Sequence, residues 1–379
     1  MNKLPYTKTV LRNGVRLILV PMEGVNSIAT AVMVGVGSRY ETTKINGISH
    51  FLEHMVFKGT EKYPTTDDVN TIERAGGLQN AYTDIDVTNY HNKVLSEDWL
   101  LALDINKELA LNPRLPEAWV NKERDVILEE MKRYEDEPAN KVEEIYHSLL
   151  YPHTKLGMRI IGEEASLRCV GANELRNYHT QWYAPERMVI MLAGAIGSQS
   201  NNITEQVTEW FGALPKKKTR NIDVVTPSQT KPQLAVVTKR DAAQAHLIIG
   251  LRAYQRDSED RFAWGLFNLI MGVSFTSRLF KEIREKRGLC YHVRSGSSAY
   301  HDVGSWDIYA GVATDKVEEA TKAIIEELMK AKAGGITEDE LTVARKRLKT
   351  MLAFRSEDPE FWTEWYGRTE LFGMPLMTL

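Results

Sequence analysis

The residues best suited to chemistry lie close together in this sequence, in the apolar stretch from Gly47 to Phe57. His50 and His54 are four residues apart, so in a helix they share one face, and Glu53 lies beside that face. Two neutral imidazoles supply half of a tetrahedral zinc site, and the neighbouring carboxylate can act as a general base. The order His-x-x-Glu-His is the inverted form of the more familiar zinc-helix motif. The alternative interpretation is a core helix with two hydrogen-bonded histidines, and a third metal ligand decides between the two.

A second helix, predicted over residues 116–137, offers that third ligand. Proline suits the first helical position, where Pro116 stands. The apolar face of this helix is marked by Val120, Ile127 and Met131. Glu123 and Glu130 are seven residues apart and share another face. Glu129 points about 100 degrees away from Glu130 and is expected to be solvated.

These residues together resemble the pitrilysin/insulysin family of metallopeptidases, and most closely the branch of the mitochondrial processing peptidase and its short bacterial relatives. The resemblance is carried by His50-x-x-Glu53-His54, then 75 intervening residues, then Glu130 within Glu-Arg-Asp-Val-Ile-Leu-Glu-Glu. It implies that His50, His54 and Glu130 bind one zinc ion and that Glu53 is the catalytic base. It also implies that Glu123 is a carboxylate that orients a ligating histidine.

The resemblance extends to residues that would contact a substrate. The segment Gly77–Thr83 is similar to the family's active-site edge strand, to which a peptide adds through main-chain hydrogen bonds. It implies that Asn80 contacts the substrate backbone beside Ala81. From the residues alone, an Asn that ends a turn after two glycines is the preferred interpretation of Asn80.

Arg284 and Tyr291, seven residues apart in the second half, resemble the family's pair that binds substrate carbonyl groups and the developing oxyanion. Cys290 replaces the Ala or Gly that is common before this Tyr. The alternative is that a basic residue near a helix end and a tyrosine in a strand have structural roles alone.

Composition bounds the class of protein and its partners. The 379 residues are 43% hydrophobic and 26% charged, as in a globular protein, and a net charge of -3 gives no support to a nucleic-acid partner. Cys169 and Cys290 form no metal, redox or disulfide pattern. The N-terminal residues lack the features of a secretory signal, and the longest apolar stretches are too short to cross a bilayer. We therefore expect a cytoplasmic protein with no membrane partner, or a matrix protein without its presequence.

The chain is long enough for two domains, and the predicted elements repeat between its halves. In the first half, strands are predicted at 7–11, 15–20, 27–36, 78–84, 87–94 and 187–195, and longer helices at 96–111, 116–137, 141–150 and 173–182. In the second half, strands are predicted at 233–238 and 245–251, and helices at 260–271, 337–354 and 360–372. Aligning Gly272 with Gly59 puts Ala263, Leu266 and Phe267 where the metal motif stood, so the second half should lack the metal.

The expected fold class is therefore α+β, with two homologous α/β domains, each a mainly antiparallel sheet packed with helices. The first domain should span 1–215, a linker 216–232, and the second domain 233–379. Family members usually continue with another helix and a closing strand, so the second domain is expected to be C-terminally short.

The predicted function is a zinc-dependent endopeptidase that hydrolyses extended oligopeptides or unfolded segments. By the resemblance, it should work as a homodimer or as a heterodimer with a related chain. Two alternatives stay open: a non-catalytic core or partner subunit of the same fold, and a presequence-processing peptidase. Non-catalytic chains typically lose part of the metal set, whereas all four of its positions are present here.

Overall fold

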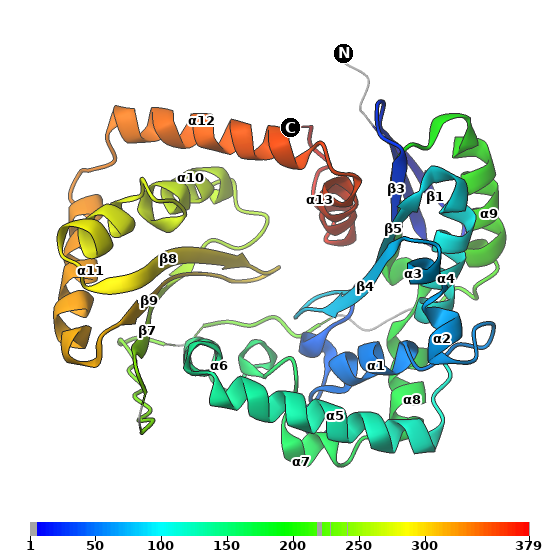
Figure 1. The fold of residues 1–379 in the computed structure, drawn as a ribbon, viewed down its shortest axis with the longest axis horizontal. Helices are drawn as coiled ribbons and strands as arrows, with labels where there is room; N and C mark the ends of the chain where they lie inside the picture. Colours follow the sequence, from blue (N-terminus) through cyan, green and yellow to red (C-terminus); the bar gives the residue numbers. More distant parts are fainter. Residues whose placement is uncertain (1–5, 218–221, 228, 241, 379) are drawn as a thin grey trace. The chain divides into compact units, whose positions relative to one another are not determined.

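The computed structural model describes residues 6–378 except 218–221, 228 and 241, and the chain forms two compact units (Figure 1). Unit 1 comprises the described residues up to 130, 158–222 and 354–379, and unit 2 comprises 131–157 and 223–353. The expected contiguous division at 215 and 233 differs from these units in two segments. Part of the expected linker, 218–221 and 228, lies outside the described residues.

Unit 1 is built on one sheet, to which six strands contribute within the described residues. They are β1 (Thr7–Val10), β2 (Arg16–Pro21), β3 (Ser27–Val34), β4 (Leu78–Thr83), β5 (Thr88–Leu95) and β6 (Met188–Gly194). Their order is β1-β2-β6-β3-β5-β4, and all neighbours are antiparallel except β2 and β6. The Val- and Ala-rich strands β3 and β6 are central and buried. Strand β4 is at the edge.

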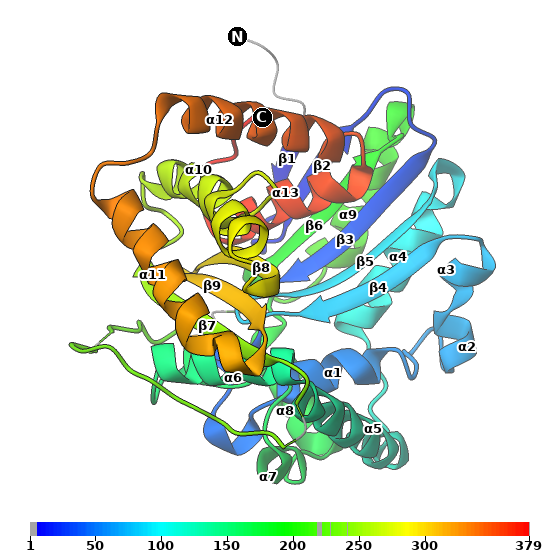
Figure 2. The same ribbon diagram turned by 60° about the vertical axis from the view of Figure 1, so that its left-hand side comes forward.

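Helices cover both faces of this sheet. They are α1 (Ile48–Val56), α2 (Thr66–Val69), α3 (Thr71–Arg74), α4 (Trp99–Leu111), α5 (Glu117–Asp136), α7 (Glu164–Leu167), α8 (Ala172–Trp182), α9 (Ser200–Gly212) and α13 (Pro359–Leu371). Strand β3 shows the two faces, since alternate side chains point to opposite sides. Thr30 bonds to Asn106 of α4, whereas Met33 packs with Tyr366 of α13. Figure 2 shows α4 and α13 on opposite sides of the sheet.

The C-terminal helix α13 therefore completes unit 1, although the sequence placed it in the second domain. Tyr366 is fully buried in a cluster with Met33 and Met191 of the first sheet. The aromatic residues of α13 need an apolar surface to cover, and the open face of the first sheet provides one.

Unit 2 is built on a smaller antiparallel sheet of order β7-β9-β8. Its strands are β7 (Ala245–Ala253), β8 (Cys290–Ala299) and β9 (Gly304–Val312). Its helices are α6 (Pro138–Leu150), α10 (Arg261–Gly272), the π-helical η7 (Phe280–Lys286), α11 (Val317–Lys332) and α12 (Glu338–Arg355). The end of α5, residues 131–136, also belongs to this unit. The core of this unit surrounds the fully buried Trp306.

One predicted strand is wrong. Residues 233–238 form no strand, and the side chains of Leu234, Val236 and Val237 are 86%, 79% and 64% exposed. A high β propensity needs a paired, half-buried surface to act on, and this segment has no strand partner among the described residues. No described helix combines the length and apolarity that crossing a bilayer requires.

Candidate metal centre

Helix α1 carries three polar residues of the motif on its half-buried side. Its remaining side chains, such as Phe51, Leu52 and Met55, are fully buried and anchor the helix. The helix begins after Gly47, which has φ +93, and a Cβ there would lie 2.6 Å from the carbonyl oxygen of Ile161. Only glycine adopts this conformation in so tight a contact without strain. The start of the helix, and so the direction of its side chains, is fixed.

A buried carboxylate also holds the N-terminus of α1. Glu41 accepts hydrogen bonds from the backbone nitrogens of Gly47 at 2.6 Å and Ser49 at 2.8 Å, and from Asn46 Nδ2 at 2.9 Å. Burial raises the pKa of Glu41 to about 7, although these hydrogen bonds oppose the rise. Sequence reasoning missed this residue, because its distance of six residues from Gly47 matches no capping pattern.

Glu123 of helix α5 contacts one of the two histidines, His54. Glu123 Oε1 lies 2.9 Å from His54 Nδ1, and Glu123 Oε2 lies 2.9 Å from Lys58 Nζ. Burial would raise the pKa of Glu123, but the contacts with His54 and Lys58 outweigh it, so the pKa is lowered. An ionised Glu123 favours a proton on His54 Nδ1, which leaves Nε2 free to bind a metal. Lys58 was not identified from the sequence, although it follows His54 by one helical turn.

Glu130, one heptad further along α5, lies close to both imidazoles. Its Oε2 is 3.5 Å from His54 Nε2 and 3.9 Å from His50 Nε2. His50, His54 and Glu130 each offer one ligand atom, and these three atoms lie within 4.8 Å of one another. Among the described residues, this group has the geometry needed to hold a metal ion. Ligands about 2.1 Å from a tetrahedral zinc ion are about 3.4 Å apart. The spacing of His50, His54 and Glu130 therefore fits zinc.

The protonation state of His50 also suits a metal. Burial, with a smaller contribution from His54, lowers the pKa of His50 to about 3. The imidazole is therefore neutral at pH 7 and offers a lone pair. Its Nδ1 is buried and has no hydrogen-bond partner within the described chain. Two neutral imidazoles and one carboxylate are the donor set of many catalytic zinc sites.

Glu53 lies on the same helix, beside the ligand group. Burial raises the pKa of Glu53 above its usual value. Contacts with Thr83 and His54 counteract part of this rise, and Glu130 adds to it. A carboxyl group whose pKa is shifted towards neutrality can both accept and return a proton, which is what a general acid–base group must do.

The strand β4 carries the residues predicted to contact a substrate. Its pairing with β5 leaves its other edge without a strand partner in the part of the chain that the structure describes. Asn80 is exposed, and its own Oδ1 accepts a hydrogen bond from the backbone nitrogen of Ala81 at 2.9 Å. Asn80 lies within the predicted strand and does not end a turn, and its contact with a substrate stays a prediction.

Arg284 and Tyr291 belong to unit 2 and are described within it. Arg284 is in η7, and Tyr291 is in β8 with a 75% exposed side chain. The Arg284 guanidinium lies 5.2 Å from the centre of the Tyr291 ring and 4.8 Å from that of Phe280. The two residues thus lie in contact with each other. Their relation to a substrate stays a prediction.

Comparisons with known proteins match both halves of the chain. Residues 18–164 match the insulinase family (peptidase family M16), and residues 170–348 match the peptidase M16 inactive domain. The uncharacterized zinc protease YmxG of Bacillus subtilis is 35% identical over 95% of this chain and 87% of its own length. An uncharacterized zinc protease of Mycobacterium leprae is 34% identical over 96% of this chain and 82% of its own length.

Solved structures share the fold. A protease from Helicobacter pylori superimposes with a TM-score of 0.90 at 24% identity, covering 98% of this chain and 91% of that one. A peptidase M16 inactive domain from Pseudomonas fluorescens superimposes with a TM-score of 0.87 at 20% identity, covering 98% and 89%. The expected fold class, two α/β domains with mainly antiparallel sheets, is confirmed.

Proposed function

Because this chain belongs to the insulinase family (peptidase family M16), we propose that it is a zinc-dependent endopeptidase acting on extended oligopeptides or unfolded segments. The observation that carries the proposal is the meeting of His50, His54 and Glu130 beside Glu53. The names of the relatives support zinc as the metal.

The chemistry follows from the residues of unit 1. His50, His54 and Glu130 would hold one zinc ion per chain, with Glu123 keeping His54 in the correct tautomer. Zinc supplies Lewis-acid polarisation of the peptide carbonyl and acidifies a water molecule. Glu53 would accept the proton of the attacking water and then deliver it to the nitrogen of the leaving amine.

The substrate would bind along β4. The Ala81 N–H now donates a hydrogen bond to Asn80 Oδ1. A peptide that adds to the free edge of this strand would accept that hydrogen bond with a backbone carbonyl in place of Asn80. Such binding requires an extended backbone, which a folded protein rarely offers, and so favours oligopeptides and unfolded segments. Arg284 and Tyr291 are proposed, from the resemblance alone, to stabilise the oxyanion.

A non-catalytic subunit of the same fold is the second candidate. It is favoured by the match of residues 170–348 to a domain described as inactive. The complete ligand set and the intact base in unit 1 favour the enzyme. A presequence-processing role would differ in substrate only, and pairing with a second chain and a cytoplasmic location remain proposals from the sequence.

The substitution Glu53→Gln tests the function. We expect this variant to retain zinc by elemental analysis and to lose hydrolysis of a quenched-fluorescence peptide library. The matched control is Glu129→Gln, which neutralises an exposed carboxylate next to Glu130 and should leave turnover unchanged. Turnover by the Glu53→Gln variant at the wild-type rate would reject Glu53 as the base. Peptide hydrolysis by wild-type protein that a chelator does not reduce would reject the zinc mechanism.

A further inference from the structure

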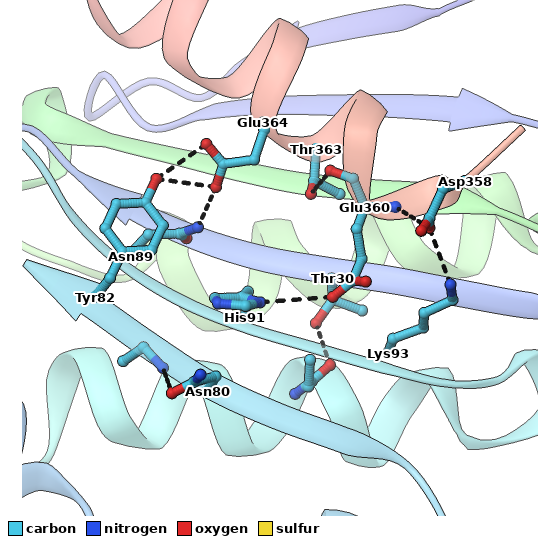
Figure 3. A network of polar contacts seen from close by, with 12 residues as sticks. Thr30, Asn80, Tyr82, Asn89, His91, Lys93, Asp358, Glu360, Thr363 and Glu364 are labelled. Carbon is cyan, nitrogen blue, oxygen red and sulfur yellow. Dashed lines mark hydrogen bonds and ion pairs between the residues drawn. The ribbon is translucent and has the colours of Figure 1, made fainter. Parts of the chain in front are cut away.

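Helix α13 presents a row of charged side chains to the edge of the first sheet. Glu360, Glu364 and Arg368 are spaced by four residues, so they lie along one side of the helix. Figure 3 shows Glu360 and Glu364 pointing from α13 towards β4 and β5. The neighbouring side of α13 is the aromatic one that packs on the centre of the sheet. The charged row is thus an additional feature, which the packing of α13 does not require.

Two residues of this row bind the edge strand itself. The Tyr82 hydroxyl donates to Glu364, whose two oxygens are each 2.9 Å away. Arg368 Nη2 donates to Asp84 Oδ2 at 2.8 Å, and Arg368 Nη1 donates to the Tyr82 hydroxyl at 3.3 Å. We call these four residues, Tyr82, Asp84, Glu364 and Arg368, the α13 clamp. Burial raises the pKa of Tyr82, and Glu364 adds to the rise, so the phenol keeps its proton and remains a donor.

Glu364 also ties the edge strand to its neighbour. Its Oε1 accepts from Asn89 Nδ2 at 2.8 Å, and Asn89 of β5 is the register partner of Tyr82. One carboxylate therefore fixes two directly paired residues of β4 and β5. By contrast, Glu360 Oε1 lies 3.8 Å from Nδ1 of His91 in β5.

The clamp holds the opposite side of the strand from the catalytic base. Tyr82 and Thr83 are consecutive in β4, so their side chains point to opposite faces. Tyr82 bonds to Glu364 of α13, whereas Thr83 lies near Glu53 of α1. Among the described residues β4 pairs with β5 alone, so contacts on the faces of β4 help to limit its twisting and fraying.

We propose that Glu364 and Arg368 are positioning residues that hold β4, through Tyr82 and Asp84, in the conformation to which a peptide substrate adds. The inference rests on the proposed peptidase function. If only a fraction of the molecules has the strand in the binding conformation, the apparent affinity for the peptide is reduced by that fraction. Weakening the clamp should therefore reduce peptide affinity without touching the metal ligands.

The test uses the zinc-loaded full chain carrying Glu53→Gln, so that peptide binding is measured without turnover. Tyr82→Phe removes one hydroxyl of the clamp, and Glu364→Ala removes its central acceptor. The matched control is Tyr366→Phe, because the buried Tyr366 hydroxyl on α13 has no hydrogen-bond partner among the described residues. Binding of a fluorescent extended peptide is followed by anisotropy, and hydrogen exchange of the amides in Leu78–Thr83 is measured alongside.

We expect Tyr82→Phe to raise the Kd roughly threefold to tenfold, which is less than the full contribution of a hydrogen bond to a charged group, because the contacts of Glu364 with Asn89 and of Arg368 with Asp84 remain. Glu364→Ala should raise the Kd further. The β4 amides should exchange faster in both variants, while zinc content stays equal. In the chain with Glu53 intact, KM should rise and kcat should change less than KM. The control should match the parent in each measurement.

The outcomes separate the two proposals. If the parent binds the peptide and both clamp variants bind it equally well, the positioning role is overturned and the peptidase function stands. If the variants only lower the melting temperature, with unchanged Kd and β4 exchange in the folded protein, the clamp is structural and the inference is overturned. If the wild-type chain loaded with zinc neither binds nor cleaves any peptide, the proposed function fails and takes this inference with it.

Discussion

The contact between Glu123 and His54 leads to a graded prediction about metal affinity. Glu123 accepts from His54 and from Lys58, each at 2.9 Å. The variant Glu123→Gln keeps one acceptor oxygen but loses the charge. If that oxygen faces His54, the amide NH2 must face the Lys58 ammonium, so two donors meet. Glu123→Ala removes both acceptors and leaves His54 free to rotate or to change tautomer.

The magnitude follows from these contacts. Substituting the carboxylate that orients a metal-binding histidine typically costs about 10- to 100-fold in metal affinity. At 1.4 kcal/mol for each factor of ten, this is roughly 1.4–2.8 kcal/mol of binding free energy. We expect Glu123→Gln to lie near the lower end, about tenfold, because it can still accept from His54. Glu123→Ala should approach about 100-fold, because it cannot.

Competition with a chromophoric chelator measures the zinc affinity directly, at constant pH and without any substrate. Glu129→Gln is the matched control, since it removes an exposed carboxylate from the same helix. Its zinc affinity should equal that of the wild type. Equal affinities for the wild type, Glu123→Gln and Glu123→Ala would refute the claim that Glu123 orients a metal ligand. A larger loss for Gln than for Ala would refute the hydrogen-bond argument and point to the charge contact with Lys58.

Two further predictions concern α1. His50 has a pKa of about 3 in the folded metal-free protein against about 6.5 unfolded, so the unfolded chain binds more protons between these values. The stability of the metal-free protein should therefore fall as the pH is lowered from about 6.5 towards 3, by at most about 1.4 kcal/mol per pH unit from this residue, and less steeply for His50→Gln in urea unfolding. Gly47→Ala should destabilise the protein by roughly 2–4 kcal/mol, because it combines a positive φ with a clash at 2.6 Å. Gly24→Ala, where φ is also positive but no atom lies within 4 Å, should cost clearly less, and equal melting temperatures for the two would contradict the steric argument.

The candidate metal ligands could be identified from the sequence because most of their geometry is local. Helical periodicity alone places His50 and His54 on one face, and it places Glu123 and Glu130 on one face of the second helix. The family resemblance then predicted that the two helices contribute to one metal site. The structure brings these four residues together with Glu53 as expected.

The supports of the site could not be predicted, since each depends on a contact between distant segments. Glu41 reaches the start of α1 from a loop, and the clamp joins residues more than 280 positions apart. Neither contact has a spacing that a pattern could reveal. The exposed segment 233–238 shows the converse: the sequence predicts a strand there, but no neighbouring strand pairs with it among the described residues.

The placement of α13 explains why a division by sequence alone misses the true units. The helix follows α12 directly along the chain, and a contiguous boundary therefore assigns it to the second half. The contacts of its residues show that it belongs to the first sheet. Tyr366 packs on the apolar face of that sheet, while Glu364 and Arg368 bind polar partners at its edge. The first sheet offers both, with Met33 and Met191 at its centre and Tyr82 at its edge. Because the same helix buries the centre and binds the edge, a cut of the chain before residue 354 should expose the first sheet and release β4 together.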